Sequence, residues 1–473
     1  MESPFAHVYP PGAAFASLKD IEGKKVTVMG IGLNGGGEES IRFFLRHGAL
    51  VTATDTKGEG ELLPTLDALR AAPGSERLRF VLGRHEGADF SGADVVIKNP
   101  VVKYEGNDYL SRARRVETDV SVFLGLTKAP VIAVTGSKGK STTASAIHHG
   151  LCGAGFSAFL GGNITVSPLS FLEKTTGDTP VVLELSSWQL RDLRGRGLLR
   201  PRAAVITTIV GDHQNWYSSM GDYVADKALI YADQGPRDWT ICVAGPWGDV
   251  FASESPARVI QVDPAAAARE PPLAPLLPGA HNRLNLRLAS QALAAAGIPA
   301  GTIEGVFALW GGIPHRLEWF LSWDSPAGGK AAFYNDTAAT VPEAASAALC
   351  AFEKPVYLIA GGTDKALDFT PLADALAGLR DTPGFRPVFL LPGTGTEKLL
   401  PLLEARRVPV EGPFGSIGAL LERLRSLLQN EGGDCAVVFS PGAASFGMFK
   451  NEFHRGDVFK EDARAVFGST TLF

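Results

Sequence analysis

The stretch PVIAVTGSKGKSTTASAIHHG, at residues 130–150, decides the fold of this chain. A short apolar run ends in a glycine-rich turn, and a helical pattern follows directly. Backbone amides of such a turn can cradle phosphate oxygens, the Lys140 ammonium can reach the β- and γ-phosphates, and the Ser141 hydroxyl can face Mg²⁺. Val134 stands where the standard P-loop has its first glycine, so this loop is two residues shorter. The predicted phosphate-binding residues are Gly136, Ser137, Lys138, Gly139, Lys140, Ser141 and Thr142.

Outside this stretch the chain alternates between short β-branched apolar runs and helical patterns. Runs this continuously apolar are typical of strands buried on both faces, hence of parallel sheets with ligands at their carboxyl ends. The sequence predicts a doubly wound α/β fold. The expected strands lie at 25–30, 50–55, 94–100, 130–136, 181–187, 203–209, 240–245, 355–362, 387–393 and 435–441, and the expected helices include 38–49, 141–155 and 284–297. The Ala/Pro-rich segment 253–278 is expected to be an irregular connection.

The length and composition limit the class of protein. With 473 residues the chain is too long for one core, and we expect three domains, at 1–120, 121–313 and 314–473. A net charge of −5 argues against a broad nucleic-acid-binding face. Four widely spaced cysteines predict neither a disulfide framework nor a zinc site. Since no signal peptide or membrane span is expected, the composition favours a cytoplasmic protein.

A second glycine loop precedes the P-loop in the chain. Residues 30–35 read G-x-G-x-x-G after an expected strand, and Asp55 ends the next strand. Glycines there let the backbone approach a diphosphate, so a nicotinamide dinucleotide or another nucleoside diphosphate would fit, as would a tight turn without a ligand. Two nucleotide loops in successive domains are awkward for a dehydrogenase. They suit an enzyme that binds one nucleotide-linked substrate and consumes another nucleotide.

Two strand ends in the middle of the chain carry candidate metal ligands. Glu184 ends one apolar run, and Asp212 and His213 follow the next. A glutamate and a histidine at neighbouring strand ends can hold a divalent ion between them. Taken singly, Glu184 also fits an ordinary polar strand end, His213 a loop histidine, and Lys227 a solvated helix lysine.

Ten motifs follow one another along the chain. They are TGSKGKST (135–142), GGN (161–163), ELSSWQL (184–190), GDH (211–213), DKALIY (226–231), GAHNRLN (279–285), PHRLE (314–318), NDTAAT (335–340), GGTDK (361–365) and SPGAASFGMFKNEFHRGDVF (440–459). Together they resemble the Mur ligases, the ATP-dependent amide-forming enzymes of peptidoglycan synthesis. The resemblance runs from Lys24 to about Phe459, and the short first loop and the NDT and GGTDK stretches favour the D-glutamate-adding branch.

The resemblance implies three domains: a Rossmann-like UDP-binding domain, a P-loop ATPase centre and a Rossmann-like C-terminal domain. It also implies that ATP phosphorylates the alanine carboxylate of UDP-N-acetylmuramoyl-L-alanine, and that the amine of D-glutamate then attacks the acyl phosphate. ATP and two Mg²⁺ ions are the implied cofactors. The implied partners are small-molecule substrates only, with a monomer and a cytoplasmic location in cell-wall synthesis.

The motifs also imply roles for individual residues. The UDP substrate is assigned Gly32, Leu33, Asn34, Asp55, Thr56, Asn99, Pro100 and Asn163. The nucleotide is assigned Asn282 and Asn285 for adenine, Arg316 for phosphate and Asp336 for ribose, besides the P-loop. The incoming amino acid is assigned Thr340, Lys365, Ser445 and Phe446. The magnesium site is assigned Ser141, Glu184, His213 and Lys227, the last as a carbamylated lysine, and the catalytic set is Lys140, Glu184, His213 and Lys227.

Four positions depart from the family pattern. Ala338 replaces the lysine and Val341 the final asparagine of D-S-K-A-T-N, and Thr208 and Lys138 replace frequent asparagines. Without the lysine at 338, Lys365 is expected to carry more of the carboxylate binding. The open alternatives are a related ligase for another amino acid, including folate polyglutamylation, a nicotinamide-dependent oxidoreductase and a non-catalytic nucleotide-binding scaffold.

Overall fold

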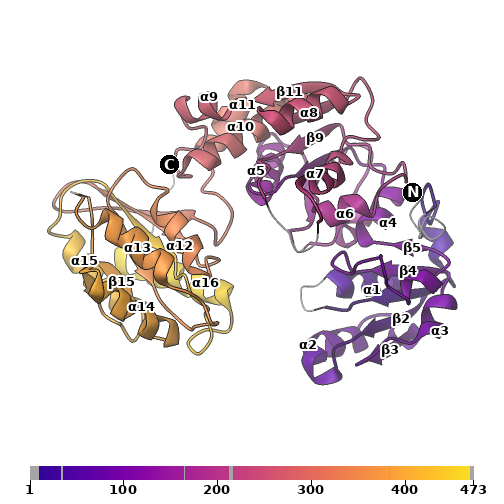
Figure 1. Ribbon diagram of the computed structural model, residues 1–473, viewed down its shortest axis with the longest axis horizontal. Helices are drawn as coiled ribbons and strands as arrows, with labels where there is room; N and C mark the ends of the chain where they lie inside the picture. Colours follow the sequence, from indigo (N-terminus) through magenta and orange to yellow (C-terminus); the bar gives the residue numbers. More distant parts are fainter. Residues whose placement is uncertain (1–9, 33–35, 165, 212–216, 383, 469–473) are drawn as a thin grey trace. The chain divides into compact units, whose positions relative to one another are not determined.

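The structure is a computed structural model that describes residues 10–32, 36–164, 166–211, 217–382 and 384–468. The chain folds into two compact units. The first contains residues 1–270 and 284–306, and the second contains residues 271–283 and 307–473. Figure 1 follows the chain through three sheets, two in the first unit and one in the second. Each unit is described by itself.

The N-terminal sheet is entirely parallel, with strand order β3-β2-β1-β4-β5. Its central strand β1 leads into the first glycine loop, and α1 begins after it. The strands are β1 Lys25–Met29, β2 Leu50–Asp55, β3 Leu78–Leu82, β4 Val95–Lys98 and β5 Val116–Glu117. The helices are α1 Gly36–Arg46, α2 Glu59–Arg70, α3 Gly87–Ser91 and α4 Asp119–Leu126.

The second sheet is also parallel, with strand order β11-β10-β9-β6-β8-β7. Because β6 lies between β8 and β9, the loops that follow these three strands meet at one edge. The strands are β6 Val131–Thr135, β7 Phe159–Gly162, β8 Val181–Glu184, β9 Ala203–Ile206, β10 Trp239–Val243 and β11 Arg258–Val262. The helices are α5 Lys140–Gly153, α6 Ser187–Arg191, α7 Met220–Ala228, α8 Pro246–Glu254, α9 Pro264–Arg269, α10 Ala280–Ala295 and α11 Ala300–Ala308.

The third sheet has strand order β12-β13-β17-β14-β15-β16, and β12 runs antiparallel to β13. The loops that follow the parallel strands β13, β17 and β14 therefore share an edge. The strands are β12 Glu318–Asp324, β13 Lys330–Asn335, β14 Val356–Ala360, β15 Val388–Leu390, β16 Val410–Glu411 and β17 Cys435–Phe439. The helices are α12 Pro342–Leu349, α13 Thr370–Leu379, α14 Thr394–Ala405, α15 Ile417–Leu428 and α16 Glu452–Phe467.

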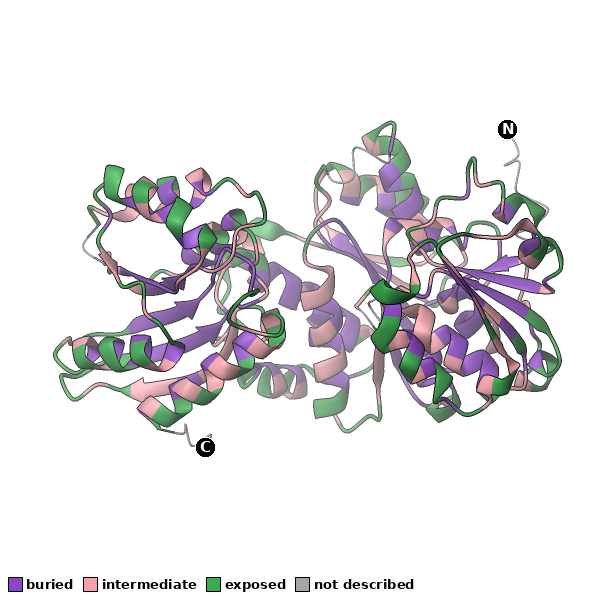
Figure 2. Cartoon of the chain, turned by 90° about the horizontal axis from the view of Figure 1, so that it is seen from below, coloured by how far each residue is buried: buried purple, intermediate pink, exposed green. Residues whose placement is uncertain are grey.

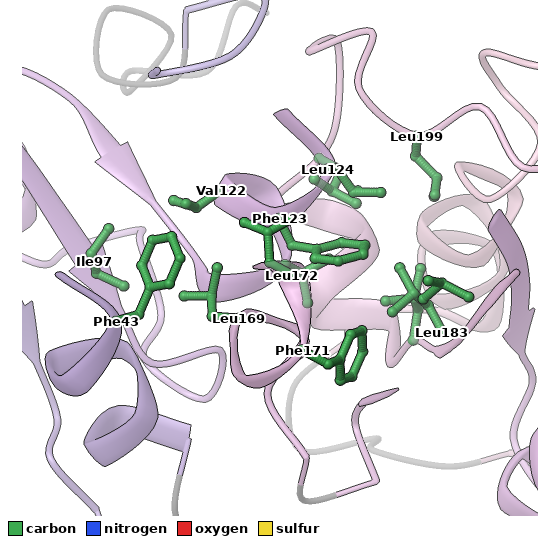
Figure 3. Close-up of a cluster of buried hydrophobic side chains, with 14 of the residues drawn as sticks. Phe43, Ile97, Val122, Phe123, Leu124, Leu169, Phe171, Leu172, Leu183 and Leu199 are labelled. Carbon is green, nitrogen blue, oxygen red and sulfur yellow. The ribbon is translucent and has the colours of Figure 1, made fainter. Parts of the chain in front are cut away.

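The buried side chains explain why these elements hold together. One core runs from the N-terminal sheet into the second sheet, through Phe43, Ile97, Phe123, Phe171 and Leu183 (Figure 3). In the second unit, α12, α13 and α14 cover one face of the sheet, and α15 and α16 cover the other. The strands are mainly buried, whereas the helices keep an exposed face (Figure 2). Such two-sided burial accounts for the continuous apolar runs in the sequence.

The predicted α/β class is confirmed, and each of the ten expected runs contains a strand. The prediction for 253–278 is wrong, because β11 and α9 lie there. β11 is an edge strand and only half-buried, so it lacks a continuous apolar run. Pro264 opens α9, where a missing amide is tolerated, and Asp263 caps the helix. Among the described residues, no helix has both the length and the apolarity needed to cross a membrane.

Candidate active site

The P-loop connects β6 to α5 and requires glycine at two positions. Gly136 has φ of 145° and Gly139 has φ of 93°. A Cβ on Gly136 would lie 1.9 Å from Thr207 Oγ1, and one on Gly139 would lie 2.2 Å from Asn285 Oδ1. Positive φ and close approach therefore both exclude a side chain here. The contact also brings buried Asn285, assigned to adenine, against the phosphate loop.

Hydrogen bonds hold the P-loop to the end of β9. The amides of Ser137 and Lys138 donate to the Thr208 carbonyl over 2.9 and 3.3 Å, and Thr207 Oγ1 donates to the Lys138 carbonyl over 2.7 Å. These two amides are therefore paired within the protein. Lys140 Nζ folds over the loop and donates to the carbonyls of Gly136 and Ser137 over 3.0 and 2.9 Å. The N-terminus of α5, which begins at Lys140, adds the positive end of a helix dipole.

A buried carboxylate lies beside this loop. Glu184 ends β8, pairs in register with Val134 of β6, and is 1% exposed. Its Oε1 accepts a hydrogen bond from Asn163 Nδ2 over 2.9 Å, which brings two predicted site residues together. Among the described residues, Oε2 is buried without a hydrogen-bond partner. A buried, unsatisfied carboxylate oxygen suits a hard cation such as Mg²⁺.

Lys227 reaches the same loop from α7. The residue is 1% exposed. Its ammonium donates to the Gly136 carbonyl over 2.8 Å and lies 4.4 Å from the centroid of the Tyr223 ring. Tyr223 Oη in turn donates to Ser137 Oγ over 3.1 Å. Lys227 is therefore not the solvated helix lysine that its position alone suggests. Tyr223 was missed by the sequence analysis, although its place one turn before Lys227 on α7 was a signal for it.

The other proposed metal ligand, His213, and its neighbour Asp212 lie outside the described residues. Within the described ranges, no cluster of three His, Cys, Asp or Glu side chains could hold a metal. Ser141, the remaining proposed ligand, is half-buried in the first turn of α5.

At the first glycine loop, the structure gives Asp55 a supporting role. Its Oδ2 accepts hydrogen bonds from the amides of Ile31 and Gly32 over 3.0 and 3.1 Å, and its Oδ1 accepts one from the Lys57 amide over 3.0 Å. The buried carboxylate thus fixes the path of the loop. Thr56, next in the chain, is exposed.

A small cavity opens beside this loop. Gly30, Ser40, Asn99, Pro100 and Asp119 are among its lining residues. Two predicted substrate contacts, Asn99 and Pro100, therefore lie next to the glycine loop. Asp119 also lines the cavity, and its burial raises the pKa of its carboxyl group.

The close approach between helix and strand falls at Gly37. A Cβ on Gly37 would lie 2.2 Å from the Gly30 carbonyl oxygen, so α1 packs directly on the loop there. Gly35, the last glycine of the G-x-G-x-x-G pattern, lies outside the described residues together with the predicted substrate contacts Leu33 and Asn34.

In the second unit, the residue assigned to the ribose is Asp336, whose pKa is shifted by burial. It follows β13, is 9% exposed, and accepts hydrogen bonds from Ser440 Oγ over 2.6 Å and from the Leu317 amide over 3.1 Å. Burial raises the pKa of Asp336 to about 6. Arg316 is exposed between two residues with positive φ, His315 at 67° and Leu317 at 45°. Such strained turns concentrate at functional sites.

Two further loops of this unit bring the proposed amino-acid contacts together. The amides and carbonyls of Thr363 and Ala444 exchange hydrogen bonds over 2.9 and 3.0 Å, joining the loops after β14 and β17. Lys365 Nζ lies 4.8 Å from the centroid of the half-exposed Phe446 ring. Ser445 is buried.

Two further predicted residues belong to the second unit. Thr340 is half-buried beyond the end of β13. Asn282 belongs to the second unit by its packing, and its Nδ2 donates to the Pro278 carbonyl over 2.6 Å.

Comparison with known proteins gives the relationship. Residues 134–269 match the Mur ligase middle domain. A protein of Treponema pallidum (strain Nichols) named UDP-N-acetylmuramoylalanine--D-glutamate ligase is 41% identical, over 94% of this chain and 98% of the relative. The chain belongs to the Mur ligase family. A Roseiflexus relative with the same name is 36% identical over 93% of this chain and 98% of its own. The resemblance drawn from the motifs is thus confirmed.

Solved structures of the Mur ligase family share the fold. The UDP-N-acetylmuramate-alanine ligase MurC of Thermotoga maritima superposes with a TM-score of 0.54 at 18% identity, covering 93% of this chain and 99% of its own. A Thermotoga maritima MurF ligase in complex with ADP superposes with a TM-score of 0.50 at 14% identity, covering 99% of this chain and 98% of its own. At these identities the likeness shows the three-domain fold alone.

Proposed function

We propose that this Mur ligase uses ATP to join D-glutamate to UDP-N-acetylmuramoyl-L-alanine. The observation that carries the proposal is the near full-length similarity to relatives named for that reaction. The cluster of Lys140, Glu184 and Lys227 around the P-loop supports it, because phosphoryl transfer needs charge neutralisation and positioning more than a protein nucleophile.

The proposed reaction has two steps. A carboxylate oxygen of the alanine attacks the γ-phosphorus of ATP, and ADP leaves. The amine of D-glutamate then attacks the acyl carbon, and the tetrahedral intermediate expels inorganic phosphate while the amine loses a proton to solvent. Both steps build up negative charge on phosphate oxygens, which the N-terminus of α5 and the Lys140 ammonium would stabilise. When ATP binds, the Lys140 ammonium would replace its hydrogen bonds to the Gly136 and Ser137 carbonyls with hydrogen bonds to phosphate oxygens.

We assign Mg²⁺ to Glu184, because Oε2 is buried without a partner among the described residues. Asn163 fixes the other carboxylate oxygen and so orients the ligand. A bound Mg²⁺ would neutralise phosphate charge. Ser141, His213 and a carbamylated Lys227 complete the proposed set, and a second ion is part of the same proposal.

The incoming amino acid is assigned to the loops of the second unit that carry Thr340, Lys365, Ser445 and Phe446. Ala338 offers no charge, so we propose that the Lys365 ammonium binds a carboxylate of D-glutamate. The same departure favours a second candidate, a ligase of this family for a different amino acid. The three domains at 1–120, 121–313 and 314–473 would bind the UDP substrate, ATP and the amino acid. Each contains one of the three sheets. We also propose a cytoplasmic location and a monomeric state, as the family resemblance implies.

Phosphate release measured with a series of amino acids tests the assignment. We expect phosphate release only when both UDP-N-acetylmuramoyl-L-alanine and D-glutamate are present. A preference for another amino acid would instead support the second candidate, a ligase of this family for a different amino acid. Lys140→Ala should abolish turnover, whereas Lys174→Ala, an exposed lysine in the same unit, should not. Lys227→Ala should be inactive and regain activity with short carboxylic acids. Full activity without them would remove Lys227 from the site.

A further inference from the structure

Arg455 is one of the largest fully buried side chains of the protein. It lies in the first turn of α16 and is 1% exposed. Its Nε donates to Thr337 Oγ1, its Nη2 to the Thr337 carbonyl and its Nη1 to the Ala443 carbonyl, each over 3.0 Å. One guanidinium therefore joins the loop after β13 to the loop after β17.

The acceptors in this set are uncharged. Burial lowers the pKa of Arg455 to about 10, which still leaves the guanidinium charged at neutral pH. Thr337 is fully buried, and its hydroxyl also donates to the Glu452 carbonyl over 2.8 Å, which ties the same loop to the start of α16. Hydrogen bonds from a charged donor are stronger and more directional than neutral ones, so this fork defines the relative position of both loops.

Glycines let the backbone come close around this guanidinium. A Cβ on Gly456 would lie 2.4 Å from Thr337 Cγ2 and 2.5 Å from His315 Nδ1, so α16 rests directly on the 336–340 loop. A Cβ on Gly362 would lie 2.5 Å from the Ala444 carbonyl oxygen and 3.5 Å from Arg455 Nη1. The guanidinium thus lies where the loops after β13, β14 and β17 meet.

These three loops carry every residue that we assign to the incoming amino acid. Thr340 follows Thr337, Lys365 follows Gly362, and Ser445 follows the Ala443–Ala444 segment. We propose that Arg455 is the positioning residue of the amino-acid pocket, whose buried fork holds the loops after β13 and β17 in register without touching substrate. The backbone pair between Thr363 and Ala444 joins the loop after β14 to them. The proposal rests on the proposed function for its kinetic consequence, but its structural consequence stands alone.

Arg455→Met and Arg455→Lys test this role in the full-length chain. The methionine keeps most of the volume and removes all three hydrogen bonds, whereas lysine keeps the charge and part of the bonding. Losing bonds from a charged donor should raise the KM for D-glutamate by about tenfold or more, with a smaller change for the UDP substrate. The KM for D-glutamate of Arg455→Lys should lie between the values of the wild type and Arg455→Met. In Arg455→Met, amide hydrogen exchange should accelerate at 337–340 and 443–445.

Arg464→Met is the matched control, because Arg464 lies on the same helix and is exposed beside Phe320. It should leave both the KM and the exchange rates unchanged. If Arg455→Met folds poorly, Arg455→Lys and Thr337→Val give the same measurements with milder changes. Unchanged exchange at both loops would overturn the proposal, and so would an equal loss of affinity for all three substrates. If the wild type does not use D-glutamate, the function fails, while the exchange experiment still decides the role of Arg455.

Discussion

Replacing Glu184 with glutamine should separate stability from activity. The carboxylate is 1% exposed, and only Oε1 has a partner, Asn163, among the described residues. An unsatisfied buried polar group costs about 1–3 kcal/mol, and more when it is charged. Glutamine keeps the shape and the acceptor for Asn163 while it removes the charge. We therefore expect the metal-free variant to be as stable as the wild type or more stable by about 1–2 kcal/mol.

The same substitution should abolish turnover. If Oε2 binds Mg²⁺, losing that ligand should cost several kcal/mol of transition-state stabilisation, or at least about 100-fold in kcat. Urea unfolding in EDTA and in excess Mg²⁺, with phosphate release in parallel, measures both effects. Mg²⁺ with an unreactive ATP analogue should stabilise the wild type but not Glu184→Gln.

The companion variant Asn163→Ala leaves Oε1 without its side-chain donor. It should lose about 1–2 kcal/mol of stability in EDTA, opposite in sign to Glu184→Gln. The reasoning is refuted if Glu184→Gln unfolds more easily than the wild type by over about 1 kcal/mol and keeps turnover within about tenfold.

Three further predictions follow from other contacts. Gly139→Ala should lose ATP turnover, because a left-handed φ costs about 1–2 kcal/mol and the new Cβ meets Asn285; wild-type kinetics would show that the loop adapts. Arg196→Met should lower the free energy of unfolding in urea by about 1–3 kcal/mol, because the fully buried Glu117 loses one of its two arginine partners and keeps Arg115. Adding Glu117→Leu should recover part of the loss, and strictly additive losses would contradict the pairing. Asp336 has a folded-state pKa of about 6, above its unfolded value, so the folded state holds the extra proton between about pH 4 and 6. Stability should therefore fall by about 2–3 kcal/mol as the pH rises through that window. Asp336→Asn should remove that slope in unfolding at pH 4.5 and 7, and an unchanged slope would place the titration elsewhere.

Most of the strands that the sequence predicted are buried on both faces, although β13, buried from Ala331 to Asn335, was missed. Strands such as β6, β8 and β9 are fully buried and therefore appear as unbroken apolar runs. The edge strand β11 is half-exposed, and β12 is only partly buried and antiparallel. Their polar residues interrupt the pattern, so neither was predicted.

The candidate site was predictable as a set of motifs, but not as a set of contacts. The burial of Lys227 against Gly136 and the support of the glycine loop by Asp55 depend on residues far apart in the chain. The bond between Arg455 and Thr337 spans 118 positions. No local pattern encodes such approaches, because they join loops and helices that lie far apart in the sequence.

Phosphate release by the full chain tests the central assignment most directly, with ATP, UDP-N-acetylmuramoyl-L-alanine and D-glutamate each omitted in turn. The account predicts release when all three are present and none when the nucleotide sugar or D-glutamate is missing. No release from the complete mixture, or equal release without D-glutamate, would contradict it.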